Sequence, residues 1–349
     1  MPLPNLDGKY TSGKRRIRLF RGQQPRFQLP ISLVILAAIG LLLWLVPTAA
    51  PVSHQPFQVT GFTPPPATFT PTPSPVPTDV HGGLIVFTCT RGDTNQICAV
   101  HADGSGLSRL TNNDTNNYYP AFSPRGDSIV YASLVNGTFE LFLMVLSNSK
   151  LFQLTNNIGN AFSPDFSPDG QQILFLNRAG DGPSSIWLMG KTGENPHLLY
   201  AGSNNIVAAA WSPHGDSIAF AMAVTNYSYQ IFLLDPNHPE QKPRQVTQSM
   251  NDIGGSLDWA PDGSNLLIYA GPVGGREVYR VDVQTGQVTQ LTFGGNNAAP
   301  SYSPDGQYIV YNSLRNNNQA DLYIMRADGH STRQLTNDPE PDWQPKWGP

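Results

Sequence analysis

The chain of 349 residues contains few charged residues and only two cysteines. Charged residues make up 13% of the sequence, about half the usual share, whereas glycine and proline number 32 each. This combination favours an all-β protein outside the cytoplasm over a helical cytosolic protein. Residues 1–28 carry a net charge of +6, which leaves −10 on the rest of the chain. An acidic body argues against nucleic acid as a partner, because phosphate binding requires clustered positive charge.

The common catalytic motifs are also absent from the sequence. It contains no G-x-S-x-G nucleophile elbow, no P-loop and no H-E-x-x-H zinc motif. The seven histidines are scattered, and a histidine-bound metal would need several of them to converge on one face. We therefore expect a protein that is not an enzyme, with no catalytic residues, no metal and no cofactor.

One long apolar stretch covers residues 29–46, LPISLVILAAIGLLLWLV. As an α-helix, its 18 residues would span about 27 Å, enough to cross the hydrocarbon core of a bilayer. The basic residues before it predict a single-pass signal anchor, with residues 1–28 as a cytoplasmic tail and the later chain outside the cytoplasm. The alternative is a signal peptide cleaved near Ala50, which would release a secreted protein.

Residues 47–81 form a segment rich in proline and threonine, with ten prolines. Such a composition cannot build a core and favours extended polyproline II structure. At about 3.1 Å per residue, the segment could reach roughly 100 Å. We expect an extracytoplasmic linker that holds the following domain away from the membrane.

A strand–turn–strand unit recurs along the remaining chain. Each copy contains a Ser-Pro-x-Gly turn, or Ala-Pro-x-Gly once, before a β-rich apolar run. Proline at the second turn position and glycine at the fourth suit a type I turn between two strands. Repeats of 43 to 48 residues with strand-type content are typical of a β-propeller with one four-stranded blade per repeat. The anchoring prolines are Pro124, Pro168, Pro213, Pro261 and Pro304.

Alignment of the two chain ends raises the number of blades from five to six. Residues 342–349 align with the innermost strand of a repeat, and residues 82–89 align with its second strand. A blade shared between the two ends closes the ring without an exposed sheet edge. We therefore predict an all-β, six-bladed propeller of four-stranded antiparallel blades over residues 82–349, preceded by one transmembrane helix.

The repeat resembles the WD-like Pro-Asp repeat of TolB-type propellers over residues 82–349. The resemblance rests on the Leu-Thr-Asn turn at 154–156, the Phe-Ser-Pro-Asp-Gly unit at 166–170 and the Ala-Asp-Gly turn at 327–329. It implies a six-bladed propeller that binds another protein. In the founding member the propeller binds a peptidoglycan-associated lipoprotein in the periplasm and follows a separate α/β domain. Here the predicted anchor and linker occupy the place of that domain.

The two cysteines, Cys89 and Cys98, flank a turn that the sequence centres between Asp93 and Thr94. In that hairpin they would lie directly across from one another, close enough for a disulfide. Oxidation is expected if the domain lies outside the cytoplasm, and two buried free thiols are the alternative.

The loops from each outermost strand to the next innermost strand are the candidate binding site. They ring one mouth of the central channel and are rich in asparagine, with some acidic and aromatic residues. These residues suit turns in any case, but they also suit recognition of a protein or a cell-wall component. The acidic members could also ligate calcium, although no fixed ligand spacing supports it. The alternative function is a carbohydrate-active lyase or hydrolase with its site at the same mouth. The candidates are Asn116, Tyr118, Tyr119, Asn160, Asn205, Asp252, Asn296, Asn297, Asp338, Glu340, Asp342 and Trp343.

Overall fold

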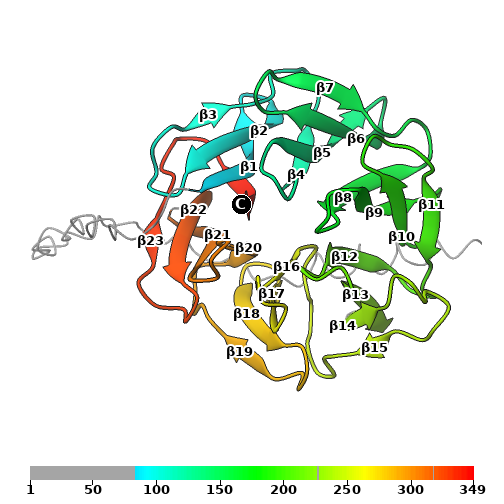
Figure 1. The fold of residues 1–349 in the computed structure, drawn as a ribbon. Coiled ribbons are helices and arrows are strands. Elements are labelled where there is room, and N and C mark those ends of the chain that lie inside the picture. The colour runs from blue at the N-terminus through cyan, green and yellow to red at the C-terminus, as the bar shows by residue number, and fades with distance from the viewer. Residues whose placement is uncertain (1–82, 226–227, 317) are drawn as a thin grey trace, which may run out of the picture. The chain divides into compact units, whose positions relative to one another are not determined.

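The computed structural model describes residues 83–225, 228–316 and 318–349, and these form a six-bladed β-propeller (Figure 1). Each of the six sheets has four antiparallel strands, and the innermost strands surround a central channel. The fold predicted from the repeat is therefore confirmed. The predicted tail, membrane helix and linker (1–28, 29–46 and 47–81) lie outside the described residues. Within the described part of the chain, no helix is long and apolar enough to cross a membrane.

We number the blades 1 to 6 from β4 onward and give the strands of each from the inside out. Blades 1, 2 and 3 are β4 (Asn117–Phe122), β5 (Ser128–Val135), β6 (Thr138–Val145), β7 (Lys150–Gln153); β8 (Asn160–Phe166), β9 (Gln172–Arg178), β10 (Ser185–Gly190), β11 (His197–Tyr200); and β12 (Ile206–Trp211), β13 (Ile218–Thr225), β14 (Ser228–Leu234), β15 (Arg244–Gln245). Blades 4, 5 and 6 are β16 (Leu257–Trp259), β17 (Asn265–Ala270), β18 (Glu277–Asp282), β19 (Val288–Gln290); β20 (Asn297–Tyr302), β21 (Tyr308–Asn316), β22 (Gln319–Arg326), β23 (Arg333–Gln334); and β24 (Asp342–Trp347), β1 (Leu84–Arg91), β2 (Thr94–His101), β3 (Ser108–Arg109).

Blade 6 joins the two ends of the propeller. The last strand, β24, pairs antiparallel with β1, and the C-terminus lies close to β1 in Figure 1. In this pairing Ile85 lies opposite Trp347 and Cys89 lies opposite Asp342. Trp347 is 6% exposed and packs with residues of blades 5 and 6. The alignment of the chain ends thus predicted the closure correctly. Neither long edge of β1 is left unpaired, because β2 covers the other one.

The Ser-Pro-x-Gly turns are stabilised by a hydrogen bond between serine and aspartate. In the complete motif the aspartate comes two residues later: the Ser167 hydroxyl donates to Asp169 over 2.6 Å. Where arginine or histidine replaces that aspartate, another aspartate, four residues after the serine, accepts the hydrogen bond from the serine hydroxyl. Ser123 donates to Asp127 and Ser212 to Asp216, both over 2.7 Å. The motif residues therefore act as turn chemistry.

In five of the six blades, a threonine after the outermost strand, preceded by leucine or once by valine, fastens that strand to the third strand of the same blade. In five blades the threonine Oγ1 accepts a backbone N–H from the third strand. In blades 1 and 4 the same hydroxyl donates to a buried glutamate, Glu140 or Glu277, over 2.5 Å. The five backbone N–H donors, each given with its threonine acceptor, are Ile97 (Thr111), Leu141 (Thr155), Ile231 (Thr247), Val278 (Thr292) and Leu322 (Thr336), and the distances are 2.8 to 3.0 Å.

The hydrophobic core is divided among the interfaces between neighbouring blades. Within the described residues, six buried clusters occur, one for each pair of adjacent blades. The cluster between blades 6 and 1, for example, contains Val86, Ile97, Ile129 and Tyr131. Each blade is thus held mainly by its two neighbours, so the ring depends on every interface.

Cys89 and Cys98 are joined by a disulfide, with their Cα atoms 5.8 Å apart. The hairpin register differs from the predicted one, because Arg91 pairs with Thr94 and the turn lies at Gly92 and Asp93. Cys98 therefore faces Phe87, and the bridged cysteines are diagonal neighbours. The Gly92 backbone has a φ of 66°, which suits a tight two-residue turn that the sequence alignment placed one residue too late.

Candidate functional site at the channel mouth

The innermost strands carry a repeated backbone irregularity that shapes the channel. In four blades a residue with positive φ precedes a proline and interrupts the pairing with the second strand. Such bulges re-aim side chains, and they occur often beside functional sites. In these four blades the sequence carries the signal as a second proline, four residues before Pro124, Pro168, Pro304 or Pro349, but the repeat analysis did not use it. The residues, with φ of 50 to 55°, are Tyr119, Ser163, Ala299 and Gln344.

One residue per blade forms a layer within the channel, just before the aromatic residue that ends each innermost strand. Three of the six are charged: Asp165, Asp258 and Lys346. The Lys346 ammonium donates a hydrogen bond to Asp258, which lies on blade 4. The other members are Ala121, Ala210 and Ser301.

The carboxylates of this layer also connect neighbouring blades. Asp165 Oδ2 accepts the backbone N–H of Trp211 over 2.9 Å, and Asp258 Oδ2 accepts that of Tyr302 over 2.7 Å. Burial raises the pKa of Asp165, although the nearby Lys346 charge opposes the shift. Burial also opposes the charge on Lys346, but the Asp258 and Asp165 carboxylates outweigh it and raise the pKa of Lys346. The charged residues of this layer therefore hold neighbouring blades of the ring together.

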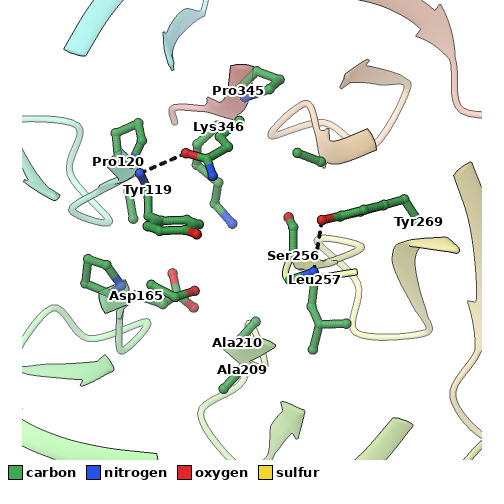
Figure 2. A pocket seen from close by; sticks show the side chains of 16 residues that line it. Tyr119, Pro120, Asp165, Ala209, Ala210, Ser256, Leu257, Tyr269, Pro345 and Lys346 are labelled. Atoms are coloured by element: carbon green, nitrogen blue, oxygen red, sulfur yellow. Dashed lines mark hydrogen bonds between the residues drawn. The ribbon is translucent and has the colours of Figure 1, made fainter. Parts of the chain in front are cut away.

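A cavity of about 230 Å³ lies in the channel next to this layer. Figure 2 shows Tyr119, Asp165, Tyr269 and Lys346 directed inward from four different blades. The Tyr119 backbone N–H donates to Gln344 Oε1 over 3.2 Å, and the Gly255 N–H donates to the Tyr269 hydroxyl over 2.9 Å (Figure 2). Burial raises the pKa of the Tyr119 hydroxyl.

A larger cavity of about 380 Å³, which we call the mouth cavity, lies among blades 4, 5, 6 and 1. It shares Tyr269, Ala299 and Gln344 with the channel cavity. Its lining combines aromatic rings, amides and a single charged side chain. The residues that define it best are Tyr118, Tyr269, Arg276, Asn296, Leu314 and Trp343.

The structure brings four of the twelve predicted site residues to the two cavities. Tyr118, Asn296 and Trp343 line the mouth cavity, and Tyr119 lines the channel cavity. The Tyr118 hydroxyl accepts a hydrogen bond from Asn95 over 2.8 Å, and its ring meets Phe139 edge-on at 5.8 Å. These contacts hold Tyr118 in a fixed orientation at the wall of the mouth cavity.

Four of the predicted asparagines have a shared structural contact. The Oδ1 of each accepts a backbone N–H at the beginning of the third strand of the preceding blade. Asn297 is also engaged, since its buried amide donates to Glu277 over 2.7 Å. The asparagine-rich loops thus fasten each blade to the previous one. The four pairs are Asn116 with Asn95, Asn160 with Phe139, Asn205 with Ser184 and Asn296 with Arg276, over 2.9 to 3.3 Å.

The predicted acidic residues gather around the hairpin between β1 and β2. Arg91 lies 2.9 Å from Asp338 and 3.4 Å from Asp342, while Glu340 accepts the Gly92 N–H over 2.8 Å. An arginine thus occupies the position between the carboxylates that a calcium ion would need. Across the described ranges, no group of three or more histidine, cysteine, aspartate or glutamate residues is arranged to hold a metal ion. Asp252 lies apart from this cluster, exposed before β16 with a φ of 53°.

The sequence analysis missed Arg276, Tyr269, Asp165, Asp258 and Lys346. Arg276 and Tyr269 belong to blade 4, away from the loops that the analysis singled out. The three channel charges could have been found by aligning the innermost strands, because each directly precedes the final aromatic residue.

Fold and site together define a closed six-bladed propeller with an amide-rich and aromatic mouth. A model of the TolB beta propeller domain matches residues 77–200 and 200–311, and the chain belongs to this family. It is 32% identical over 139 residues to an uncharacterized protein of Agrobacterium fabrum, covering 40% of this chain and 46% of that protein. It is 34% identical over 104 residues to the Tol-Pal system protein TolB of Anaeromyxobacter dehalogenans, and the match covers 30% of this chain and 24% of that protein.

A solved structure shows the same architecture. The crystal structure of TolB from Acinetobacter baumannii has a TM-score of 0.69 and 25% sequence identity, and the match covers 76% of this chain and 67% of that one. The chain spans less than half the length of the curated relatives that it matches.

Proposed function

We propose that this protein is a non-enzymatic binding module of the cell envelope and that the channel mouth holds a protein partner. The observation that carries the proposal is the mouth cavity, where Tyr118, Trp343 and Tyr269 offer aromatic surface beside several amides. Aromatic rings with adaptable amides are typical of protein recognition surfaces. Membership of the TolB propeller family supports the same conclusion.

The exposed apolar residues at the mouth support a protein partner. Val273 is 91% exposed and Phe293 is 81% exposed. Val273 lies three residues before Arg276 in the loop between β17 and β18, and Phe293 lies three residues before Asn296 in the loop between β19 and β20, so each stands on a loop that contributes a lining residue to the mouth cavity. Exposed apolar side chains on the loops that line a cavity offer contact area to a protein partner.

Photocrosslinking in the native membrane tests this proposal. A photoreactive phenylalanine analogue at position 293 should give protein adducts, identified by mass spectrometry. The same analogue at Leu151, which is 45% exposed on the outermost strand β7, serves as the matched control. Equal adducts from both positions, or none from 293, would contradict a binding site at the mouth.

The alternative, a carbohydrate-active enzyme, predicts turnover at the same mouth. The channel carboxylates Asp165 and Asp258 each accept a backbone N–H of the next blade, so part of their hydrogen-bonding capacity serves the scaffold. Hydrolysis or elimination of a cell-wall glycan by the purified protein, lost in Asp165→Asn, would favour the enzyme and refute our proposal.

We further propose that residues 29–46 anchor the propeller in the cytoplasmic membrane, with the N-terminus inside. The apolar run, the basic residues before it and the proline-rich linker at 47–81 support this arrangement. Protease added outside spheroplasts should degrade the propeller and leave a tag at residue 1 protected. An intact mass that begins after Ala50 would instead establish a cleaved signal peptide.

A further inference from the structure

Arg276 is a cation without an anionic partner in the described part of the chain. It directly precedes β18, where its backbone N–H donates to Asn296 over 3.3 Å. Its guanidinium lies 5.4 Å from the centre of the Tyr269 ring, and its buried Nε has no hydrogen-bond partner. Among the residues that the structure describes, its side chain forms no ion pair and no hydrogen bond.

Three other arginines of the propeller are engaged. Arg91 contacts the carboxylates of Asp338 and Asp342. Arg315 donates to the Tyr311 hydroxyl over 2.9 Å, and Arg333 donates to the carbonyl of Ala102. A partly desolvated guanidinium costs free energy unless an acceptor or anion compensates. Arg276 differs from these three, because its guanidinium has a buried nitrogen and makes no hydrogen bond or ion pair with the described residues, so it needs an external acceptor.

The surroundings of Arg276 favour an anion. No carboxylate lines the mouth cavity, and Arg276 is its one charged residue among those described. The neighbouring Glu277 is buried, where it accepts from Thr292 over 2.5 Å and from Asn297 over 2.7 Å. An anion in the mouth cavity would thus meet one unpaired cation and no lining carboxylate, so charge complementarity points to an acidic ligand.

The remaining surface favours a protein as the source of that anion. Tyr118, Tyr269, Trp343 and Leu314 offer apolar contact within the cavity. Beyond it, Val273 and Phe293 are almost fully exposed and would pack against apolar residues. These two residues stand on the loops that carry Arg276 and Asn296, so a polypeptide bound to both loops would present its side chains to the mouth cavity.

We infer that the mouth cavity binds the side-chain carboxylate of an aspartate or glutamate in a protein partner, with apolar residues of that partner packed on Val273 and Phe293. The guanidinium of Arg276 forms the ion pair, and the aromatic rings exclude water from it. This inference rests on the proposed function and specifies the chemistry of the partner segment.

Peptide arrays probed with the full-length protein, purified in detergent, measure whether the mouth cavity prefers a side-chain carboxylate. One array carries acetylated and amidated peptides with a single glutamate among varied apolar residues, and the paired array carries glutamine in its place. We expect the glutamate peptides to bind on the order of 30-fold more tightly than the glutamine peptides. The reason is that glutamine removes the carboxylate of a desolvated ion pair and leaves Arg276 without its partner. Arg276→Gln should abolish this preference. Arg125→Gln, a change of an exposed arginine in a Ser-Pro-x-Gly turn at the opposite end, should retain it.

Each contrary outcome separates the inference from the proposed function. If both arrays bind equally and Trp343→Ala weakens both, the mouth binds protein but the carboxylate inference is wrong. A third array carries the glutamine peptides with a free C-terminal carboxylate; if that array binds and the two amidated arrays do not, the anion comes from a chain end and the side-chain inference is wrong. If no array binds, the inference fails. Binding of cell-wall glycan fragments in place of peptides, dependent on Trp343, would overturn the proposed protein partner as well.

Discussion

The ammonium of Lys346, on the last strand of the chain, donates a hydrogen bond to the carboxylate of Asp258, two blades away. Asp258 in turn accepts the backbone N–H of Tyr302 on the blade between them. Three consecutive blades are therefore connected through one carboxylate. The closing strand is fastened by a charge pair in the channel as well as by its pairing with β1.

We expect Lys346→Met to destabilise the propeller. Removal of the ammonium leaves Asp258, whose side chain is only 11% exposed, without its cation. Loss of one partner should lower the free energy of unfolding by about 2 kcal/mol, because channel water screens part of the effect. Urea denaturation measures the change, with Lys191→Met on an exposed turn as the control. Adding Asp258→Asn to Lys346→Met should recover part of the lost stability, because it removes the unpaired carboxylate. A double variant no more stable than Lys346→Met alone would contradict the charge-pair explanation.

The stability of the ring should decrease as the pH rises from about 4 to about 7. Burial and the charge of Asp338 raise the pKa of Asp342 to about 7, although Thr336 and Arg91 oppose the shift, and burial and Asp338 also raise the pKa of Asp321 to about 6. The ordinary value of both groups is 3.8, so between these limits the folded chain binds more protons than the unfolded chain. The stability that this proton binding contributes is fully present below pH 3.8. It is lost as the pH rises through the pKa values of the folded state, about 6 for Asp321 and about 7 for Asp342.

Asp342→Asn isolates the larger part of this pH dependence. Asparagine is already the first residue of β4 and β20, as Asn117 and Asn297, and Asp342 is the first residue of β24. The variant should be more stable than the wild type at pH 7.5 and should show a flatter profile from pH 4 to 7.5 in urea titrations. Asp93→Asn, a change at an exposed turn residue of the same blade, should leave the profile unchanged.

Deletion of residues 343–349 should destabilise the whole propeller and not blade 6 alone. The deletion removes most of β24 and exposes the edge of β1. A matched point change, Trp347→Ala, removes one buried ring of the same strand and should cost about 3–5 kcal/mol. Deletion of the exposed Pro349 alone is the control. Scanning calorimetry would contradict the closure if the longer deletion melted in one transition at an unchanged temperature.

The disulfide between Cys89 and Cys98 should stabilise the closing blade by about 2–3 kcal/mol, mainly by restricting the unfolded chain. A reductant should therefore lower the melting temperature of the wild type. The double variant Cys89→Ala and Cys98→Ala should be insensitive to reductant. An intact mass that shows two free thiols without reductant would refute the bridge.

The sequence predicted the architecture because the repeat records it directly. The turn prolines set the spacing of the blades, and the chain ends aligned with parts of a repeat, so the sixth blade followed. The register of the β1–β2 hairpin did not follow, because the backbone of Gly92 allowed a turn one residue earlier than the cysteine spacing suggested. Local sequence thus specified the strands better than their exact pairing.

The candidate site was predicted only in part, for a physical reason. Tyr118 and Trp343 are each the second residue of an innermost strand, next to the loops that the repeat placed at the mouth, so position alone identified them. Arg276 carries no motif, and its importance arises from the absence of a partner, which only the three-dimensional arrangement reveals. Asn116 and Asn205, in contrast, bond to the backbone of the preceding blade, a long-range contact that composition cannot distinguish from ligand binding. Their role in binding remains a prediction.

The mouth cavity draws its lining from both sides of the seam where β24 meets β1. Trp343 and Gln344 belong to the last strand, whereas Thr88 and Asn95 belong to the hairpin that begins the propeller. A ligand that touches both groups adds its binding free energy to the strand pair on which closure depends. Occupancy of the mouth would then act as a clamp: the bound partner makes the seam harder to open, and slow opening of the seam in turn lengthens the time for which the partner stays bound.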